Sequence, residues 1–249
     1  MDNTLSELEP FGPDLWRSTD PKRILGMKLS ATMTVVRLPD SGLLLYSPVA
    51  MTTQRREAVD ALGTVTHLYA PNTFHHGWIG EWATAYPGAY VHAPAALVSK
   101  RRDLRIDRRH DEDALDTLAG VFDEVHIDGF MLEETVLVHR PSGTLLVADL
   151  VFNVGRPEHW WTKAYTRAMG FYDRVAQSRI IKWTAFNDTE RARMSLERLD
   201  ACSFDRLIVG HGDPIEEGAH AAIMHAYDWL QRQPRLLPGP RGAAFGRCG

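Results

Sequence analysis

Three segments of this sequence end a predicted strand in side chains that suit metal binding. They are residues 68–77 (LYAPNTFHHG), 145–149 (LLVAD) and 207–213 (LIVGHGD). The first supplies His75 and His76. The second ends in Asp149, and the third places His211 between two glycines. Because imidazole and carboxylate groups are ligands that zinc and iron accept in proteins, these strand ends predict a site for a divalent metal.

Each segment also has an ordinary structural explanation. A His after a strand is commonly a loop residue with a local partner, and an Asp there commonly caps a turn or a helix. The order and separation of the segments favour the metal site. Asp149 follows His76 by 73 positions, and His211 follows Asp149 by 62. Loops at strand ends, held by a rigid sheet, are where functional side chains usually lie.

The elements that must position these residues form two β-rich blocks, each followed by helices. The expected strands are 32–38, 43–47, 65–70, 89–92, 122–127, 134–139, 144–149 and 206–209. The expected helices are 53–62, 79–86, 94–101, 157–170, 188–201 and 216–232. This order predicts an α/β fold in which two sheets pack together with helices outside, an αββα sandwich. The 249 residues fit a single domain, expected over 1–233, with a flexible Pro-, Gly- and Arg-rich tail at 234–249.

Two of the metal segments resemble those of the metallo-β-lactamase superfamily. Residues 147–152 (VADLVF) resemble the family segment in which an Asp ends a strand, and residues 209–212 (VGHG) resemble its final Gly-His-Gly turn. The resemblance covers roughly residues 30–215 and is strongest for a divergent bacterial branch with a degenerate first metal motif. It implies the metallo-β-lactamase-like αββα sandwich, with metal ligands at the strand ends.

The first family motif, Thr-His-x-His-x-Asp-His-x-Gly, is only partly present. When its final His is aligned with His76, His75 stands where the family has Asp. Pro71 and Thr73 then stand where the family has its first two His. Neither residue offers a good ligand for zinc, so this part of the family's first metal site is expected to be lost.

The mid-chain His of the family has no match at its expected place, where Phe130 or Met131 falls. His126 lies slightly upstream and is a candidate only if the loop is shifted. The resemblance therefore implies that one metal site remains. Its implied ligands are His75, His76, Asp149 and His211. The expected cofactor is one divalent metal, zinc in the first instance and iron in the second.

The resemblance implies a metal-dependent hydrolase that acts on a small ester, lactone, thioester or amide, with Asp149 and His75 as catalytic residues. A metal with an open coordination position polarises a carbonyl oxygen and lowers the pKa of a water molecule. Two alternatives stay open. The chain could be a non-hydrolytic ligand-binding protein on a degenerate scaffold, or an iron-dependent redox enzyme.

Four further residues are candidates for substrate binding. They are Asn72, Thr73, Glu81 and Trp160. Asn72 and Thr73 could instead only form the turn, and Glu81 could be an exposed helical residue. Trp160 belongs to an aromatic-rich segment, residues 158–172, that could pack in the core, roof the pocket or form a homodimer surface.

Composition and charge limit the class of partner. The net charge is −4, which does not favour nucleic-acid binding, and the basic run at 100–109 is expected to be a solvated loop. No apolar run is long enough to span a membrane, and the acidic N-terminus is no secretory signal. Cys202 and Cys248 fit a reducing compartment and are not expected to pair. We therefore expect a cytoplasmic protein whose partner is a small molecule, without nucleic-acid or membrane partners.

Overall fold

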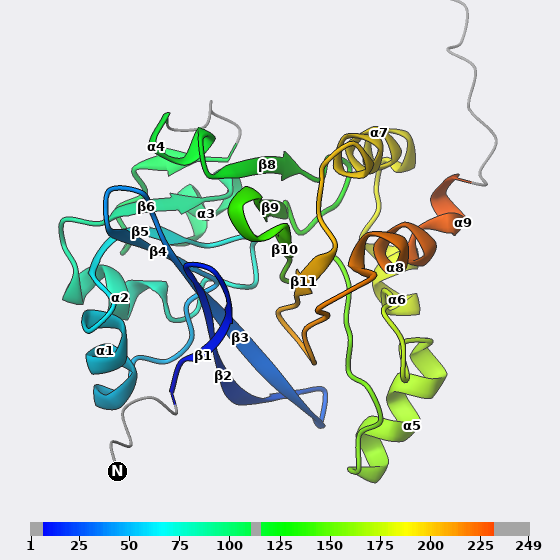
Figure 1. Ribbon diagram of the computed structural model, residues 1–249. Coiled ribbons are helices and arrows are strands. Elements are labelled where there is room, and N and C mark those ends of the chain that lie inside the picture. Colours follow the sequence, from blue (N-terminus) through cyan, green and yellow to red (C-terminus); the bar gives the residue numbers. More distant parts are fainter. Residues whose placement is uncertain (1–6, 111–115, 232–249) are drawn as a thin grey trace, which may run out of the picture.

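Two β-sheets, a large one from the first part of the chain and a small one from the second, face each other (Figure 1). The computed structural model describes residues 7–110 and 116–231. The large sheet has the order β1 (Glu9–Gly12), β2 (Leu15–Ile24), β3 (Met27–Arg37), β4 (Gly42–Tyr46), β5 (Thr64–Tyr69), β6 (Tyr90–Ala93), β7 (Arg108–Arg109). The small sheet has the order β11 (Arg206–Ile208), β10 (Thr144–Leu146), β9 (Thr135–His139), β8 (Phe122–His126).

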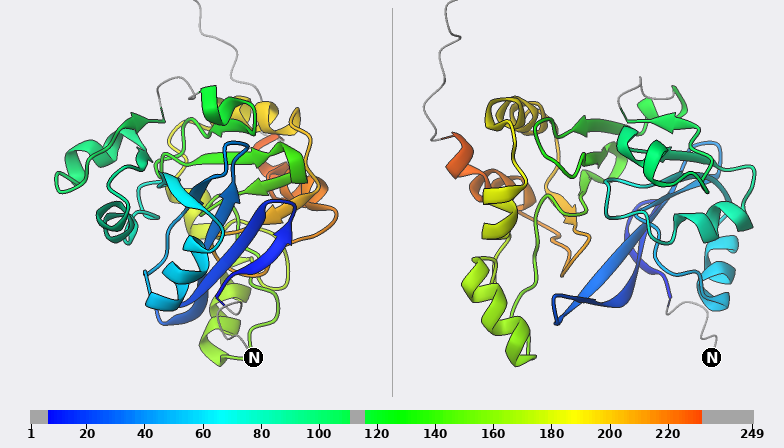
Figure 2. Two further views of the ribbon diagram at one scale, coloured as in Figure 1. Left: turned by 60° about the vertical axis from the view of Figure 1, so that its left-hand side comes forward. Right: turned by 180° about the vertical axis from the view of Figure 1, so that it is seen from behind.

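Helices cover the outer faces of both sheets (Figures 1 and 2). Those on the large sheet are α1 (Thr53–Asp60), α2 (Ile79–Ala85) and α3 (Ala95–Lys100). Those on the small sheet are α7 (Thr189–Asp200), α8 (Ala219–Ala226) and α9 (Asp228–Gln231). The remaining described helices are α4 (Asp116–Ala119), α5 (Trp160–Met169), α6 (Arg179–Thr184) and the short 3-10 helix Arg140–Ser142.

Apolar side chains fill the space between the layers. Between the two sheets lie Leu15, Val36, Leu44, Tyr46, Tyr69, Phe122, Leu137, Leu146 and Ile208. Fully buried Trp82 of α2 packs on the large sheet, and fully buried Tyr227 packs against the small one. Burial of this apolar surface holds helices and sheets together. The α/β class and the αββα sandwich predicted from the sequence are therefore confirmed.

The long hairpin formed by β2 and β3 is the main element that the sequence did not predict. Ten residue pairs join its strands, from Leu15↔Val36 to Ile24↔Met27. The expected strand 32–38 covers only the second half of β3. Residues 15–24 (LWRSTDPKRI) are largely polar and include a proline, so they lack the clear alternation that marks a strand. The far end of the hairpin lies beside α5 (Figure 1).

Two further expectations were wrong in detail. The basic run is not simply a solvated loop, because Arg108 in β7 is buried and its guanidinium lies 2.7 Å from the Glu124 carboxylate. A burial of this kind is tolerated since charge-assisted hydrogen bonds satisfy both partners. The expected helix 216–232 is divided into α8 and α9. The predicted tail, 234–249, lies outside the described residues, among which no helix is both long and apolar enough to cross a membrane.

Candidate metal centre

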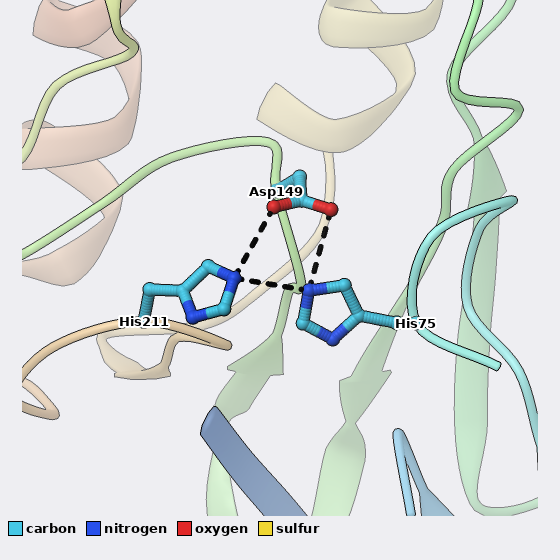
Figure 3. Close-up of side chains that lie close together, drawn as sticks. All are labelled: His75, Asp149 and His211. Carbon is cyan, nitrogen blue, oxygen red and sulfur yellow. Dashed lines mark hydrogen bonds and ion pairs between the residues drawn. The ribbon is translucent and has the colours of Figure 1, made fainter. Parts of the chain in front are cut away.

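Three of the four predicted ligands converge at one place (Figure 3). The Nε2 atoms of His75 and His211 lie 3.2 Å apart. The carboxylate of Asp149 completes the triangle, with Oδ2 3.3 Å from His75 Nε2 and Oδ1 3.5 Å from His211 Nε2. All three side chains are nearly buried, with 10%, 10% and 4% of the surface of His75, Asp149 and His211 exposed.

The topology brings these residues together from both sheets. Strands β10 and β11 are parallel neighbours, so Asp149 and His211, which follow them, emerge at the same edge of the small sheet. His75 lies in the loop after β5 of the large sheet. The facing sheets place that loop opposite the small sheet's edge. Residues far apart in the sequence thus meet because three strands end at one end of the sandwich.

The geometry of the cluster fits a divalent metal. Zinc bonds to imidazole nitrogen and carboxylate oxygen are about 2.0–2.2 Å long, so the edges of a tetrahedral ligand set are about 3.3–3.6 Å. The two imidazole Nε2 atoms are 3.2 Å apart, each has an Asp149 oxygen at 3.3 or 3.5 Å, and one ligand atom from each residue can be chosen with all three within 4.8 Å of one another. Two imidazoles and one carboxylate also form a donor set that zinc and iron accept. His75, Asp149 and His211 could therefore hold one such ion and leave a coordination position open.

Hydrogen bonds on the far side of each imidazole orient the rings. His211 Nδ1 lies 2.6 Å from the backbone oxygen of Ser30 on β3. Because a carbonyl oxygen only accepts, Nδ1 must carry the proton, and the Nε2 of neutral His211 presents its lone pair to the cluster. His75 Nδ1 lies 2.7 Å from the hydroxyl of Ser47. Partners of this kind, which fix tautomer and ring direction, are typical of metal-binding histidines.

Glu134, which was not predicted from the sequence as a site residue, contacts the segment that carries Asp149. Glu134 is fully buried, and its Oε1 accepts hydrogen bonds from the backbone N–H groups of Ala148 and Leu150. Its Oε2 accepts from the N–H of Asp149 and from the side-chain amide of Asn72. All acceptor positions of this carboxylate are thereby used. Glu134 therefore joins the segment that carries Asp149 to the loop that carries His75.

Asn72, predicted as a substrate-binding residue, is fully buried inside this network. Its amide nitrogen donates to Glu134 Oε2 and to Asp149 Oδ2, both at 2.9 Å. Its Oδ1 accepts the backbone N–H groups of Phe74 and His75 at 2.9 and 2.8 Å. An Asn side chain that binds the backbone two and three residues further on shapes a turn. Asn72 thus sets the direction of the loop at His75.

Burial and mutual charge shift the pKa values of these groups. Burial raises the pKa of Glu134, and the nearby Asp149 charge raises it further, to about 7. Burial alone would also raise the pKa of Asp149, but the charges and hydrogen bonds of His75 and His211 outweigh it and lower the pKa strongly. Burial disfavours protonated His75, yet the Asp149 charge prevails and its pKa is raised. Asp149 is therefore the persistent anion of the cluster.

His76, the fourth predicted ligand, is not among the residues that the structure brings together here. Its Nδ1 lies 2.9 Å from a guanidinium nitrogen of Arg101, which also donates to the His76 backbone oxygen. Burial, with the nearby Lys100 and Arg101 charges, lowers the pKa of His76. The imidazole is therefore held on the side of α3 by a cation, away from the three-residue cluster.

The other predicted site residues have separate surroundings. The backbone N–H of Thr73 donates to Leu132 O, and Glu81 is exposed and accepts the N–H of Met51. Trp160 on α5 is 72% exposed. At the place of the family's mid-chain His, Phe130 is buried against Phe186, with ring centroids 4.7 Å apart.

Two more residues weighed for the lost site also lie elsewhere. Met131 is 58% exposed. His126, on β8, has its Nδ1 2.9 Å from the hydroxyl of Thr135. Neither belongs to the one His, Cys, Asp or Glu cluster of metal-binding geometry found among the described residues.

Comparison with solved structures finds the same architecture. A metallo-β-lactamase from Pontibacter korlensis matches with a TM-score of 0.61 at 15% identity, over 91% of this chain and 99% of that one. The metallo-β-lactamase FIM-1 from Pseudomonas aeruginosa, in a mono-zinc form, matches with 0.58 at 12% identity, over 91% and 96%. A diflavin flavoprotein A 5 fragment from Nostoc matches with 0.65 at 11% identity, over 90% and 96%. No protein-family model and no curated protein sequence matches this chain.

Proposed function

Because this chain has the metallo-β-lactamase fold, we propose that it is a metal-dependent hydrolase with a single divalent ion at His75, Asp149 and His211. Zinc is the first expectation and iron the second, as the nitrogen and oxygen donors suit both. When bound, such an ion supplies Lewis acidity toward a carbonyl oxygen and acidifies water. The substrates proposed are small esters, lactones, thioesters and amides.

One observation carries the proposal. The lone pair of His211 Nε2 is directed at the cluster because its Nδ1 donates to Ser30 O, and the carboxylate of Asp149 lies opposite. With His75 Nε2 at 3.2 Å from His211 Nε2, one ligand atom from each of the three residues lies within 4.8 Å of the others, a spacing that one bound ion can bridge.

The residues of the chain have distinct roles in the proposed reaction. Asp149, with its lowered pKa, supplies the negative charge that favours a bound cation. Asn72 and Glu134 are positioning residues, since their hydrogen bonds fix the loop at His75 and the segment at Asp149. Thr73, Glu81 and Trp160 stay predictions as substrate contacts. His76 stays a prediction as a fourth ligand, and its contact with Arg101 does not support it.

A non-hydrolytic binding protein is the second candidate. The buried packing of Phe130 on Phe186 favours it, because no ligand for a first ion comes from that segment. A single-ion site has lost the bridging arrangement of two-metal hydrolases. It could therefore bind a carbonyl or carboxylate ligand without turning it over.

Metal content tests the first part of the proposal. We expect about one equivalent of zinc or iron per purified chain by elemental analysis. Replacing His211 by Ala should remove it, while the matched change His225→Ala, at an exposed position on α8, should not. Equal metal content in both variants and in the unaltered chain would refute the assignment of the centre.

Turnover separates the two candidates. The protein loaded with zinc or iron is assayed against ester, lactone, thioester and amide substrates, with His211→Ala as the blank. Hydrolysis by the loaded chain and its loss in the variant would support the hydrolase. Stoichiometric metal with saturable ligand binding and no hydrolysis of any class would leave only the binding protein.

A further inference from the structure

The far end of the β2–β3 hairpin and helix α5 lie side by side at one end of the molecule (Figures 1 and 2). The two elements are joined by hydrogen bonds from Trp161 Nε1 to Leu25 O, at 3.0 Å, and from the Lys28 backbone N–H to Thr162 Oγ1, at 2.9 Å. We call this the basic aromatic surface. Its residues are Lys22, Arg23, Leu25, Lys28, Trp160, Trp161, Lys163 and Arg167.

Large apolar side chains are exposed on this surface. Leu25 is 69% exposed, Trp160 72% and Trp161 38%. Leu25 and Gly26, at the tip of the hairpin, both have positive φ angles, +50° and +79°. Asn, Asp and Gly are the usual residues at such turn positions, because a larger side chain is strained there. The Leu25 side chain is mostly exposed and adds little to the core, so it is available to contact a partner.

The charge of the surface is opposite to that of the whole chain. Residues 21–28 and 159–170 contain five Lys or Arg and no Asp or Glu, whereas the chain has a net charge of −4. The nearest acids along the chain are Asp20 and Glu158, and Asp20 is ion-paired with Arg55. All five basic side chains are exposed, and the Arg167 guanidinium lies 4.4 Å from the centroid of the Tyr172 ring. Cationic groups that border Trp and Leu are typical of surfaces that lie in the interface of an anionic bilayer.

We propose that the basic aromatic surface binds membranes that contain anionic phospholipids, which departs from the sequence-based expectation of no membrane partner. Leu25 and Trp160 enter the headgroup region, and the five basic side chains contact lipid phosphates and carboxylates. A second copy fits less well, because a two-fold contact would set like charges against each other. Nucleic acid offers phosphates but no apolar layer for Leu25. This inference does not depend on the proposed hydrolase activity.

Vesicle flotation tests the proposal with the full-length protein. We expect binding to vesicles of phosphatidylcholine with phosphatidylserine, little binding to phosphatidylcholine alone, and weakening by added salt. Tryptophan fluorescence should shift to the blue on binding, since Trp160 leaves water. Absence of binding to the anionic vesicles at low salt would overturn the proposal.

Paired variants locate the surface. Leu25→Asn and the double change Arg23→Glu with Lys163→Glu should each lower the partition coefficient by about tenfold or more. The matched controls are Met194→Asn, at an exposed apolar position on α7, and Arg102→Glu, an exposed basic position elsewhere. Because Asn suits a left-handed turn position, Leu25→Asn should fold at least as well as the unaltered chain.

Three outcomes would count against the lipid surface. Equal binding by surface variants and controls would place lipid binding elsewhere. A dimer in solution that Leu25→Asn dissociates, without vesicle binding, would assign the surface to a second copy. Binding to a nucleic-acid oligomer in place of vesicles would assign it to nucleic acid.

Discussion

The buried carboxylate of Glu134 fixes the ligands of the candidate metal centre. The Glu134 carboxylate accepts the backbone N–H of Asp149 and the side-chain amide of Asn72. Asn72 in turn accepts the backbone N–H of His75. Each of its two oxygens faces two N–H donors. Any replacement must therefore satisfy four buried donors, and each one left without an acceptor costs about 1–3 kcal/mol.

We expect Glu134→Gln to weaken metal binding by about 10- to 100-fold, a range typical for residues that orient metal ligands. The Gln amide group would present an N–H₂ to two donors, whichever way it turned. Competition with a chelator measures the affinity, and thermal unfolding measures the stability. The matched control is Glu133→Gln, at a half-buried neighbour whose carboxylate accepts the backbone N–H of Ala96. A folded Glu134→Gln protein with unchanged metal affinity would contradict this role.

At the scale of elements, the turn after β11 lies very close to the backbone at Asn153. Gly212 has φ +114°, and its N–H donates to the hydroxyl of Ser30 on the β2–β3 hairpin. A Cβ atom at this position would lie 2.1 Å from the backbone oxygen of Asn153. Neither the conformation nor the space admits a side chain. The glycine after His211 is therefore required by the packing of three segments.

Gly212→Ala should displace the His211 turn and remove metal binding. Gly218→Ala is the matched control, because Gly218 also has a positive φ, +78°, but has open space around a Cβ atom. The control should cost about 1–2 kcal/mol from backbone strain alone and keep the metal. Elemental analysis and chemical denaturation measure both variants. Retention of metal by Gly212→Ala at the level of the control would show that the turn can move without loss of the site.

At the scale of the whole molecule, buried imidazoles on the large sheet make stability depend on pH. His92 is fully buried, its Nδ1 has no hydrogen-bond partner, and its Nε2 lies 2.9 Å from His67 Nδ1. Burial, with the neighbouring His67 and Arg108, lowers the pKa of His92 to about 3. Protonation is thus costly in the folded chain but not in the unfolded chain.

Below about pH 6.5, the unfolded chain binds a proton at His92 that the folded chain does not. The free energy of unfolding therefore falls as the pH falls from about 6.5 toward 3, by at most about 1.4 kcal/mol per pH unit from this group. Well above pH 6.5, His92 is uncharged in both the folded and the unfolded chain, so the free energy of unfolding no longer changes with pH through this group. We expect His92→Gln to show a shallower decline through this window in urea denaturation. The control is His225→Gln, at an exposed position. Parallel declines in all three proteins would contradict the prediction.

The sequence by itself was enough to predict the αββα sandwich and to identify Asp149 and His211 as candidate metal ligands. Asp149 and His211 could be predicted because each lies shortly after a short strand with an apolar end, and parallel neighbouring strands present their ends at one edge. The αββα sandwich followed from two β blocks, each with helices after it. These features depend on local periodicity and chain order, which a sequence displays.

Only the tertiary structure decided which of two adjacent histidines faces the centre. Neighbouring residues in a loop have no fixed direction, and here the Asn72 side chain holds the His75 N–H while Arg101 holds His76. The role of Glu134 was also decided by the tertiary structure, because its four hydrogen-bond donors come from two segments distant from it in the sequence. Strand β2 could not be predicted either, because its largely polar residues are held in the sheet by backbone pairing with β3. Hydrogen bonds between distant segments set these directions, and such bonds leave no pattern in the sequence.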